Sequence, residues 1–413
     1  MNPFQKKIPR GVIYHSIGES VRYLLGALTG PLNDKATVHH LETAFAKYSQ
    51  RNHCTAFPFA RTAIYFILKN LDLPKGSEVL LPPITIKGIV DVVLELGLTP
   101  RYVDVDMETV SFNIDDLARK ITPDVRAAIV TPLFGLVPDM PKIAGLLRQH
   151  GIYIIEDFSQ CLNGEHGDKR VGTFGDAAVY SASSIKTLDT LGGGFAITDD
   201  AALDARLKLD QTQLAPASRS LIIKKAWINL VRNVATTNPV FSLLTFPMLQ
   251  MLRWISPSSA LKQTGNRDKK RLSRLPSVWL TQYSSLQARI GLAHIDRIRE
   301  QDKARIANVE RIKAASPSAH FPKTTSASRN VYWQLILHAD DAASSQRHFS
   351  ERGIDVATSS LELVCALTDY PNRELLTNAQ RIYDNGVFIP CYPNLTNPDI
   401  QRVIAALREQ APK

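Results

Sequence analysis

A carboxylate and an amine that could carry out covalent catalysis lie on either side of one stretch of the sequence. Asp157 ends an apolar run, IYIIED, and Lys186 precedes three consecutive glycines at 192, 193 and 194. An apolar run of this length predicts a buried strand, so Asp157 should lie at its end and Lys186 in a loop. A lysine amine can bond to the aldehyde of pyridoxal phosphate, and a carboxylate can keep the ring nitrogen of that cofactor protonated. The pair therefore suggests a pyridoxal phosphate site, although an acid and a lysine occur together in most chains.

The elements around these residues predict an α/β fold. Short apolar strands alternate with helices over residues 55–200, which indicates a mostly parallel sheet with helices on both faces. Ligands of such sheets bind at the carboxyl ends of the strands. Several residues lie at expected strand ends or in the turns that follow: Asp157, Pro82-Pro83, Pro132 and the turn Ala60-Arg61-Thr62. We expect them to converge on one crevice.

The 413 residues are enough for more than one domain. We expect a large cofactor-binding domain over 1–212, a basic and apolar insertion over 213–275, and a C-terminal part over 276–413. The last part begins with one long helix at 282–312 and continues as a smaller α/β unit. Its expected strands include NVYWQLILHA and NGVFIPCYP.

Charge and cysteine content narrow the class of protein. The net charge is +10, yet residues 216–275 alone hold eleven basic residues and one acid, which leaves 38 of each in the remaining chain. The four cysteines show no C-x-x-C pair or zinc-ligand spacing, and the histidines show no ligand spacing, so we expect reduced thiols and no metal site. The N-terminus lacks the apolar core of a secretory signal, which favours a cytoplasmic protein.

Several pieces of the chain, in this order, resemble one known family. They are ARTAIYFILKNLDLPKGSEVLLPPITIKGIVDVVLELGLTPRYVDVD, VTPLFGLVPDM, IIEDFSQ, GTFGDAAVYSASSIKTL, GGGFAITDD and IPCYPNLT. Together they are similar to the DegT/DnrJ/StrS-type sugar aminotransferases, along most of the chain except residues 213–275. The resemblance implies the aspartate-aminotransferase-like fold of fold type I, in which a mostly parallel sheet domain is joined to a smaller C-terminal α/β domain. It also implies pyridoxal 5′-phosphate as the cofactor.

The resemblance assigns a role to individual residues. Lys186 would bond to the cofactor and then, once released, act as the base that moves a proton. Asp157 would pair with the ring nitrogen and, buried beside a cation, stay ionised. Gln160 would bond to the ring's phenolic oxygen, and Ser181 to the phosphate.

The start of an expected helix completes the cofactor site. Arg61 and Thr62 would offer backbone N–H groups and a hydroxyl to the phosphate, since a helix N-terminus favours an anion. Ile86 stands where the family usually stacks an aromatic ring on the cofactor. Leu280 stands where it usually has an asparagine that reaches the partner's phosphate. We suggest that Arg61 replaces part of that lost contact.

The reaction expected from the resemblance transfers an amino group, usually from glutamate, to a nucleotide-linked keto sugar. Because of these departures and the glycines at 192–194, the identity of the acceptor stays open, and it could also be lipid-linked. The expected process is cell-surface polysaccharide or lipid biosynthesis. A related dehydratase branch has histidine in place of Lys186. We expect a homodimer. The alternative is a non-catalytic or regulatory membrane-associated protein on the same scaffold.

The basic insertion admits two interpretations. Its uncharged apolar part, residues 239–252, is too short to span a bilayer and is interrupted by Pro247. Flanking basic residues, with Trp227 and Trp254, fit a segment that lies on an anionic membrane surface, on its cytoplasmic side. Alternatively, these helices pack on the partner subunit or cover the active-site mouth. Nucleic acid fits less well, because the aromatic residues are not interleaved with the basic ones.

Overall fold

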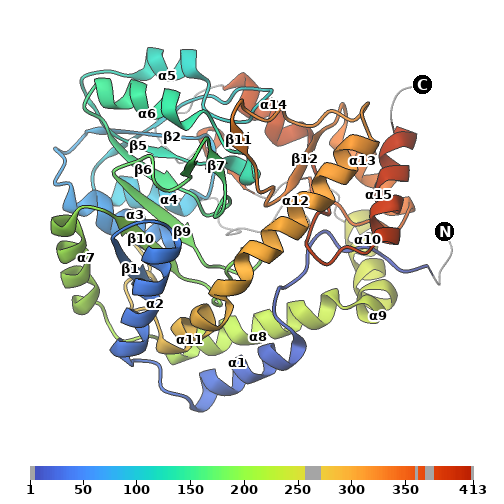
Figure 1. Cartoon of the computed structure of the whole chain (residues 1–413), viewed down its shortest axis with the longest axis horizontal. Helices are drawn as coiled ribbons and strands as arrows, with labels where there is room; N and C mark the ends of the chain where they lie inside the picture. The colour runs from blue at the N-terminus through green and yellow to red at the C-terminus, as the bar shows by residue number, and fades with distance from the viewer. Residues whose placement is uncertain (1–4, 256–270, 359–360, 368–375, 411–413) are drawn as a thin grey trace.

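The computed structural model describes residues 5–255, 271–358, 361–367 and 376–410. A seven-stranded sheet forms the centre of the larger part of the protein (Figure 1). Its strands, in spatial order, are β1 (His53–Phe57), β10 (Gly194–Thr198), β9 (Ala177–Ser181), β6 (Tyr153–Asp157), β5 (Val125–Val130), β2 (Glu78–Leu81) and β4 (Thr99–Tyr102). The last five are mutually parallel, and β10 runs antiparallel to both of its neighbours. The expected mostly parallel sheet is confirmed.

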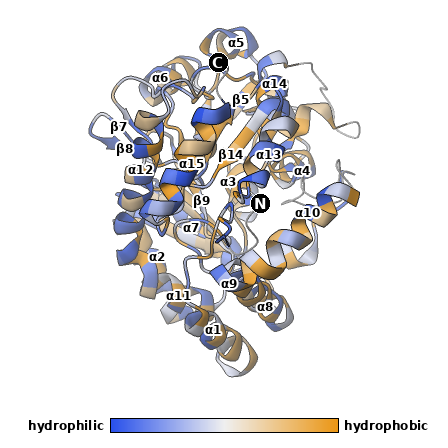
Figure 2. Cartoon of the chain, turned by 90° about the vertical axis from the view of Figure 1, so that its right-hand side faces the viewer, coloured by the Kyte–Doolittle hydropathy of each residue, from blue (hydrophilic) through white to orange (hydrophobic). Residues whose placement is uncertain are grey.

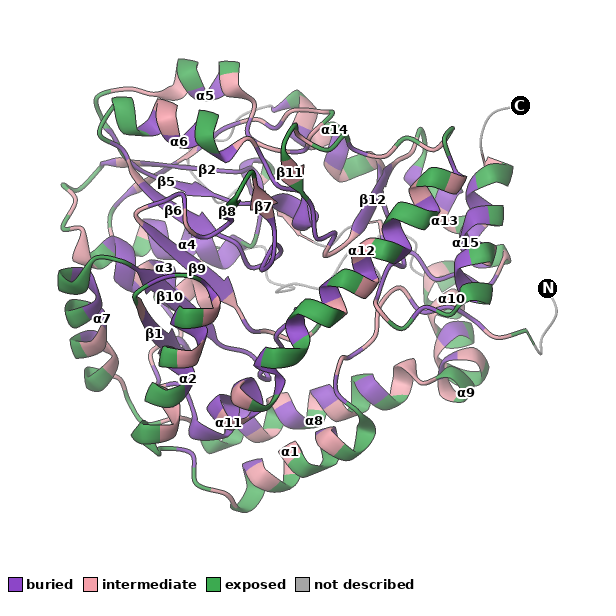
Figure 3. Ribbon diagram, in the orientation of Figure 1, coloured by how far each residue is buried: buried purple, intermediate pink, exposed green. Residues whose placement is uncertain are grey.

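Helices cover both faces of the sheet, which explains why its strands are apolar on both sides. Successive side chains of a strand point to opposite faces. In β1, Phe57 packs in a cluster with residues of α3, α4 and α7, whereas Ala56 packs in another cluster with residues of α2 and α11. Figure 3 shows the strands as buried throughout most of their length. The bounds of the covering helices are α2 (Lys35–Tyr48), α3 (Ala60–Asn70), α4 (Lys87–Glu95), α5 (Ile114–Lys120), α6 (Met140–Gln149), α7 (Ala201–Gln213) and α11 (Ser285–His294).

The C-terminal part is a small α/β unit. Strand β12 (Leu335–His338) pairs antiparallel with β14 (Gly386–Ile389). Its helices are α12 (Ile298–Ala315), α13 (Ala342–Glu351), α14 (Thr377–Asn385) and α15 (Asn397–Gln410). The start of the chain packs here too, since Ile8 bridges to Ile354 and Arg10 Nε lies 2.6 Å from Asp355 Oδ2. The division at 212 and 275 stays a prediction, and the first residues lie with the C-terminal part.

Two expected elements differ in the structure. The helix expected at 282–312 is two helices, α11 and α12, joined by a 3-10 turn at Ile295–Arg297. The turn lets Ile290 of α11 pack with α1 and α8 while Val309 of α12 packs in the main core. Only the second half of NVYWQLILHA forms a strand. Its first half is held instead by the turn Leu133–Gly135, whose Gly135 carbonyl accepts the N–H of Val331 at 2.9 Å.

The insertion is helical where the structure describes it. It comprises α8 (Arg219–Thr236), α9 (Asn238–Val240), a π-helical turn (Phe241–Thr245) and α10 (Phe246–Ile255). Helix α1 (Ile17–Thr29) lies alongside α8 (Figure 1). Among the described residues, no helix has the length and apolar character that crossing a membrane requires. Residues 256–270 of the insertion, with much of its basic charge, lie outside the described residues.

Gly135 gives a direct test of the turn that joins the two parts. Its φ is +82°, and a Cβ there would lie 2.4 Å from the Trp333 nitrogen. We expect Gly135→Ala to lower the free energy of unfolding by about 2 kcal/mol or more, because it combines backbone strain with a clash. Gly145→Ala, in the middle of α6 with open space around it, should raise it by about 0.5–1 kcal/mol. Urea unfolding followed by circular dichroism measures both, and equal effects would contradict the proposed packing.

Candidate active site

The Lys186 side chain is buried in an irregular loop between β9 and β10. Its Nζ lies 3.5 Å from the centroid of the Trp333 ring, and Trp333 Nε1 donates to the Ile185 carbonyl at 3.0 Å. Ile185 has a φ of +70°, a conformation that β-branched residues rarely adopt. Burial lowers the pKa of Lys186 to about 7, while Asp157 opposes this shift and Arg305 adds to it. A large part of the lysine is therefore a neutral amine near pH 7.

Asp157 and its neighbour Glu156 point to different environments from the end of β6. Asp157 Oδ1 accepts the Ser159 N–H at 3.1 Å. Burial raises the pKa of Asp157, and the hydrogen bonds from Ser159 and the charge of Lys186 oppose that rise. Glu156 is fully used inside the protein, because its carboxylate accepts three backbone N–H groups, those of residues 172, 174 and 175. Asp157 is thus the carboxylate of this strand end that remains available to a ligand.

Gln160 has one side of its amide fixed. Its Oε1 accepts the Phe134 N–H at 2.7 Å, and Phe134 itself has a φ of +57°. This bond comes from the turn after β5, so two adjacent strand ends meet here, as expected. With the carbonyl oxygen held, the NH2 group is the part of the Gln160 side chain that can donate to a ligand oxygen.

Ser181 and the start of α3 lie at the same edge of the sheet. Gly194 pairs with Phe57 on one side and with Ser181 on the other. A Cβ on Gly194 would lie 2.3 Å from the Ala60 nitrogen, so the helix start packs directly on this glycine. The Ser181 N–H donates to Ser159 Oγ at 2.9 Å, which ties this strand end to that of Asp157.

The residues at the start of α3 are engaged differently from one another. Thr62 Oγ1 donates to the Trp279 carbonyl at 2.9 Å, and its N–H donates to the Phe59 carbonyl at 3.1 Å. The Arg61 guanidinium lies over the rings of Trp279 and Phe59, with centroid distances of 4.6 and 5.4 Å. Thr62 is therefore held within the protein, while Arg61 lies over two rings and is acted on by the charges of Glu362 and Asp91.

Ile86, at the cap of α4, is 41% exposed. Two residues further on is Gly88, where a Cβ would lie 2.7 Å from Arg61 Nη1. The start of α4 and the start of α3 thus face each other. The side chains of this region fit the chemistry of pyridoxal phosphate: an amine for its aldehyde, a carboxylate for its ring nitrogen, an amide donor, and a helix start with a cation for its phosphate.

Comparison with known proteins agrees with this geometry. Residues 26–217 and 259–408 match the DegT/DnrJ/EryC1/StrS aminotransferase family. The chain belongs to this family. Aminotransferases of the family depend on pyridoxal phosphate, so the expected family and cofactor are confirmed.

Curated relatives bear the names of a GDP-sugar synthase and a polysaccharide biosynthesis protein. GDP-perosamine synthase of Caulobacter vibrioides is 25% identical over 89% of this chain and 88% of its own. SpsC, a spore coat polysaccharide biosynthesis protein of Bacillus subtilis, is 22% identical over 92% of this chain and 91% of its own. GDP-perosamine synthase of Vibrio cholerae, at 27% identity, matches 49% of this chain and only about half, 54%, of its own length.

Solved structures establish the fold. The sugar aminotransferase CalS13 from Micromonospora echinospora has a TM-score of 0.73 at 22% identity, covering 97% of this chain and 99% of its own. A GDP-4-keto-6-deoxymannose-3-dehydratase has a TM-score of 0.72 at 17% identity, covering 97% of this chain and all of its own. The expected fold type I architecture is confirmed.

A buried polar cluster holds the loop of this DegT-family member directly after Lys186. Arg305 of α12 is fully buried, and its Nη1 lies 2.9 Å from Asp302 Oδ1 and 3.2 Å from Thr187 Oγ1. Asn163 Nδ2 donates to the other oxygen of Asp302 at 2.6 Å. Thr187, next to the lysine, is thereby fixed to a helix more than a hundred residues away in the sequence.

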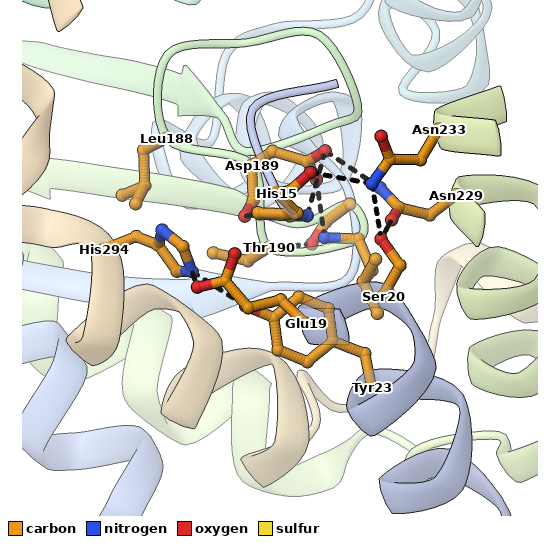
Figure 4. A network of polar contacts seen from close by, with 12 residues as sticks. His15, Glu19, Ser20, Tyr23, Leu188, Asp189, Thr190, Asn229, Asn233 and His294 are labelled. Carbon is orange, nitrogen blue, oxygen red and sulfur yellow. Dashed lines mark hydrogen bonds and ion pairs between the residues drawn. The ribbon is translucent and has the colours of Figure 1, made fainter. Parts of the chain in front are cut away.

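A second cluster joins the same loop to α1, α8 and α11 (Figure 4). Asp189 Oδ2 accepts from Asn229 Nδ2 of α8 at 3.3 Å, and the Asp189 carbonyl lies 3.0 Å from His15 Nε2. Asn233 of α8 donates to the His15 carbonyl at 2.7 Å. The insertion therefore takes part in positioning the lysine loop from its inner side.

Sequence reasoning overlooked the residues that reach the site from distant elements. Trp333 lies in a segment expected to be an ordinary strand, Arg305 in a helix whose charges are mostly exposed apart from Asp302, and Lys225 in a basic run. A tryptophan and an arginine at positions that helical or strand spacing places inward were the available signals. Among the described residues, no group of three or more histidines, cysteines or acids could hold a metal ion.

The pKa of Lys186 predicts how fast the amine reacts at each pH. Only the neutral amine is nucleophilic, so the rate of cofactor attachment should rise through about pH 7 and level off above it. In Asp157→Asn the charge that raises the lysine pKa is lost, and the midpoint should move to lower pH. The visible absorbance of the attached cofactor, followed after mixing with apoprotein, measures the rate. Nα-acetyl-lysine is the control, since its rate should climb toward its ordinary pKa of about 10.4. A protein profile that tracks this control would refute the buried neutral amine.

Proposed function

We propose that this chain transfers an amino group between a small-molecule donor and a keto sugar or related carbonyl compound, with pyridoxal phosphate bound at Asp157, Gln160, Ser181, Arg61, Thr62, Ile86 and Lys186. The observation that carries the proposal is the buried Lys186 amine beside the carboxylate of Asp157, on a fold type I scaffold. The competing role, a non-catalytic protein on the same scaffold, gives no reason for both groups to be buried together.

Each of these residues would have its own role in the reaction. When bound, pyridoxal phosphate supplies an aldehyde that bonds to amines and a ring that accepts electrons. Asp157 would pair with the ring nitrogen, and the Gln160 amide would donate to the ring oxygen. Lys186, in large part neutral near pH 7, would take a proton from the substrate carbon and deliver it to the cofactor carbon. Trp333 and the strand ends exclude water from the amine.

The acceptor belongs to the sugar class by analogy with the relatives. Relatives at 25–34% identity bear the names GDP-perosamine synthase and UDP-N-acetyl-3-dehydro-alpha-D-glucosamine 3-aminotransferase. A nucleotide-linked keto sugar is therefore the first acceptor to test. Ile86, Leu280 and the glycines at 192–194 differ from the usual residues near the acceptor, so a lipid-linked keto sugar is the second. Both would serve polysaccharide or lipid biosynthesis at the cell surface.

The amino donor and the assembly are further parts of the proposal. We propose glutamate as donor, and glutamine is the competitor to include because relatives named L-glutamine:2-deoxy-scyllo-inosose aminotransferase are 31% and 29% identical to parts of the chain. We also propose a homodimer, which light scattering of the purified protein checks. A monomeric mass at micromolar concentration would exclude it.

Substitution of Lys186 tests the proposed chemistry. We expect the wild-type protein to show the visible band of lysine-bound cofactor, to lose it with glutamate, and to regain it with the correct acceptor. Lys186→Ala should lack the band and lose at least about a hundredfold in turnover, because the proton-transferring group is gone. Lys142→Ala, which removes an exposed lysine of α6, is the matched control. If glutamate and glutamine both leave the band unchanged, the aminotransferase proposal fails.

An exposed apolar face on the insertion favours attachment to a membrane surface. Trp227 and Val231 of α8 are 56% and 46% exposed, and Leu243, Leu244 and Trp254 are 66%, 67% and 85% exposed. Figure 2 shows apolar residues along α8 and α10. Residues 216–255 contain no acid and five basic residues. Three of these basic residues, all on α8, are exposed, whereas Lys225 is turned inward and Arg253 pairs with Asp355. Because the face combines apolar side chains with exposed positive charge, we propose an anionic membrane surface on the cytoplasmic side as its occupant.

Vesicle flotation tests this face. The wild-type protein should float with mixed phosphatidylcholine and phosphatidylserine vesicles and much less with phosphatidylcholine alone, since the basic residues need anionic lipid. Replacing Leu243, Leu244 and Trp254 by serine should abolish flotation. Leu209→Ser, which changes an exposed leucine of α7, should not change it. Wild-type protein that stays at the bottom with both vesicle types would refute the proposal. A loss of dimer mass in the triple variant would then assign the face to a second subunit.

A further inference from the structure

Lys225 of α8 has a buried ammonium group with no hydrogen-bond or ion-pair partner among the described residues. Helical spacing explains its direction. The buried residues of α8 are Ile222, Ala226, Asn229 and Asn233, and position 225 lies on that side, while the adjacent Lys224 is exposed. The helix therefore places one of two neighbouring lysines inside the protein.

The Lys225 ammonium lies at the start of α3 and beside the glycine turn before β10. Its Nζ is 4.4 Å from the centroid of the Phe59 ring, and Phe59 is the cap residue of α3. A Cβ on Gly192, whose φ is +99°, would lie 2.7 Å from this nitrogen. The turn at 192–194 leads directly to Gly194, which pairs with Ser181. Lys225 thus approaches the edge where Ser181 and the helix start meet.

A second cation, Arg61, stands at the same place. Arg61 lies over the same Phe59 ring and forms no ion pair among the described residues, although the charges of Glu362 and Asp91 act on it. Burial lowers the pKa of Lys225 to about 8, and repulsion from Arg61 adds to the shift. The charge of Asp189 opposes it, but this carboxylate is occupied by the Leu191 N–H and by Asn229. The ring of Phe59 compensates poorly for the buried ammonium of Lys225 beside a second cation.

This combination of groups suits one class of ligand. The first N–H groups of α3, those of Ala60 and Arg61, have no acceptor within the helix and favour an anion. Two cations and a helix start together match a phosphate dianion, which needs several donors and about two positive charges.

We propose that Lys225 and Arg61 bind the phosphate group of the cofactor at the start of α3, so that the inserted helix α8 completes the cofactor site from within the same chain. The proposal rests on the proposed function, since it concerns the cofactor of that reaction. It adds a residue of the insertion to the site. It also assigns cofactor binding to the inward-facing Lys225 and not to the exposed lysines of the same segment.

Cofactor titrations of the full-length apoprotein test the proposal. Lys225→Met should weaken the binding of pyridoxal phosphate about 10-fold to 100-fold, the loss expected for one charge-assisted hydrogen bond. The binding of pyridoxal, which lacks the phosphate, should change less than about threefold. Lys224→Met removes the same charge from the exposed neighbour and should change neither. Absorbance of the attached cofactor and quenching of protein fluorescence give both affinities.

Thermal unfolding with inorganic phosphate keeps the two proposals separable. Phosphate should raise the melting temperature of wild-type and Lys224→Met apoprotein but not that of Lys225→Met, whose melting temperature without phosphate should equal or exceed that of the wild type because a buried unpaired charge is gone. If pyridoxal phosphate gives no visible band but phosphate stabilises only proteins with Lys225, the proposed function fails and the phosphate site stands.

Two outcomes would overturn the inference. One is equal pyridoxal phosphate affinity in Lys225→Met and Lys224→Met. The other is an effect of Lys225→Met confined to a nucleoside diphosphate, added as a competitor, with cofactor affinity unchanged, which would assign the cation to the substrate. Lys225→Arg, which retains the charge, should restore most of the phosphate-dependent affinity and excludes a purely structural loss.

Discussion

The structure depends on keeping one lysine amine buried, fixed and in large part uncharged. An ammonium group loses much of its hydration when it is buried, and this loss is what lowers the pKa of Lys186. Asp157 lies close enough to moderate the shift and thus to keep the amine near the middle of its titration at neutral pH. The two residues form a balanced pair: a more distant carboxylate would leave more of the amine neutral, and a direct ion pair would leave more of it charged.

The loop that carries this amine has no sheet ladder of its own, so its geometry has to come from outside. Residues 187–190 are held in turn by α12, by the Tyr180 hydroxyl that accepts the Leu188 N–H, by α8, and by Tyr283, whose hydroxyl donates to Thr190. Each support is buried and polar, which makes it directional. Helices α1 and α8 therefore serve the site as much as the sheet does, although they lie outside the sheet.

The sequence was informative wherever a functional residue follows a strand directly. Asp157 and Ser181 end strands β6 and β9, as expected, and Gln160 follows three residues after β6, because a strand of period two fixes where its end lies and which neighbours meet there. Their roles toward the cofactor stay a prediction. The sequence could indicate only that Trp333 and Arg305 face inward. Their partners in the lysine loop lie more than a hundred residues away in the sequence, so no local pattern identifies them. The bend at 295–297 was hidden for a related reason: the apolar spacing continues through it, and only the packing partners change.

The basic insertion shows why a net charge says little about what a charge does. Lys224 and Lys225 are adjacent and contribute equally to the excess positive charge of residues 216–275. Lys224 is nevertheless exposed, whereas the ammonium group of Lys225 is buried. A solvated lysine keeps its hydration and interacts weakly with distant charges. A buried ammonium group without a partner destabilises the fold until an anion binds to it. The outer face of α8 can therefore add to attraction by an anionic surface, and its inner face can bind one phosphate group. Composition identified the segment, and only the direction of each side chain separates these two uses.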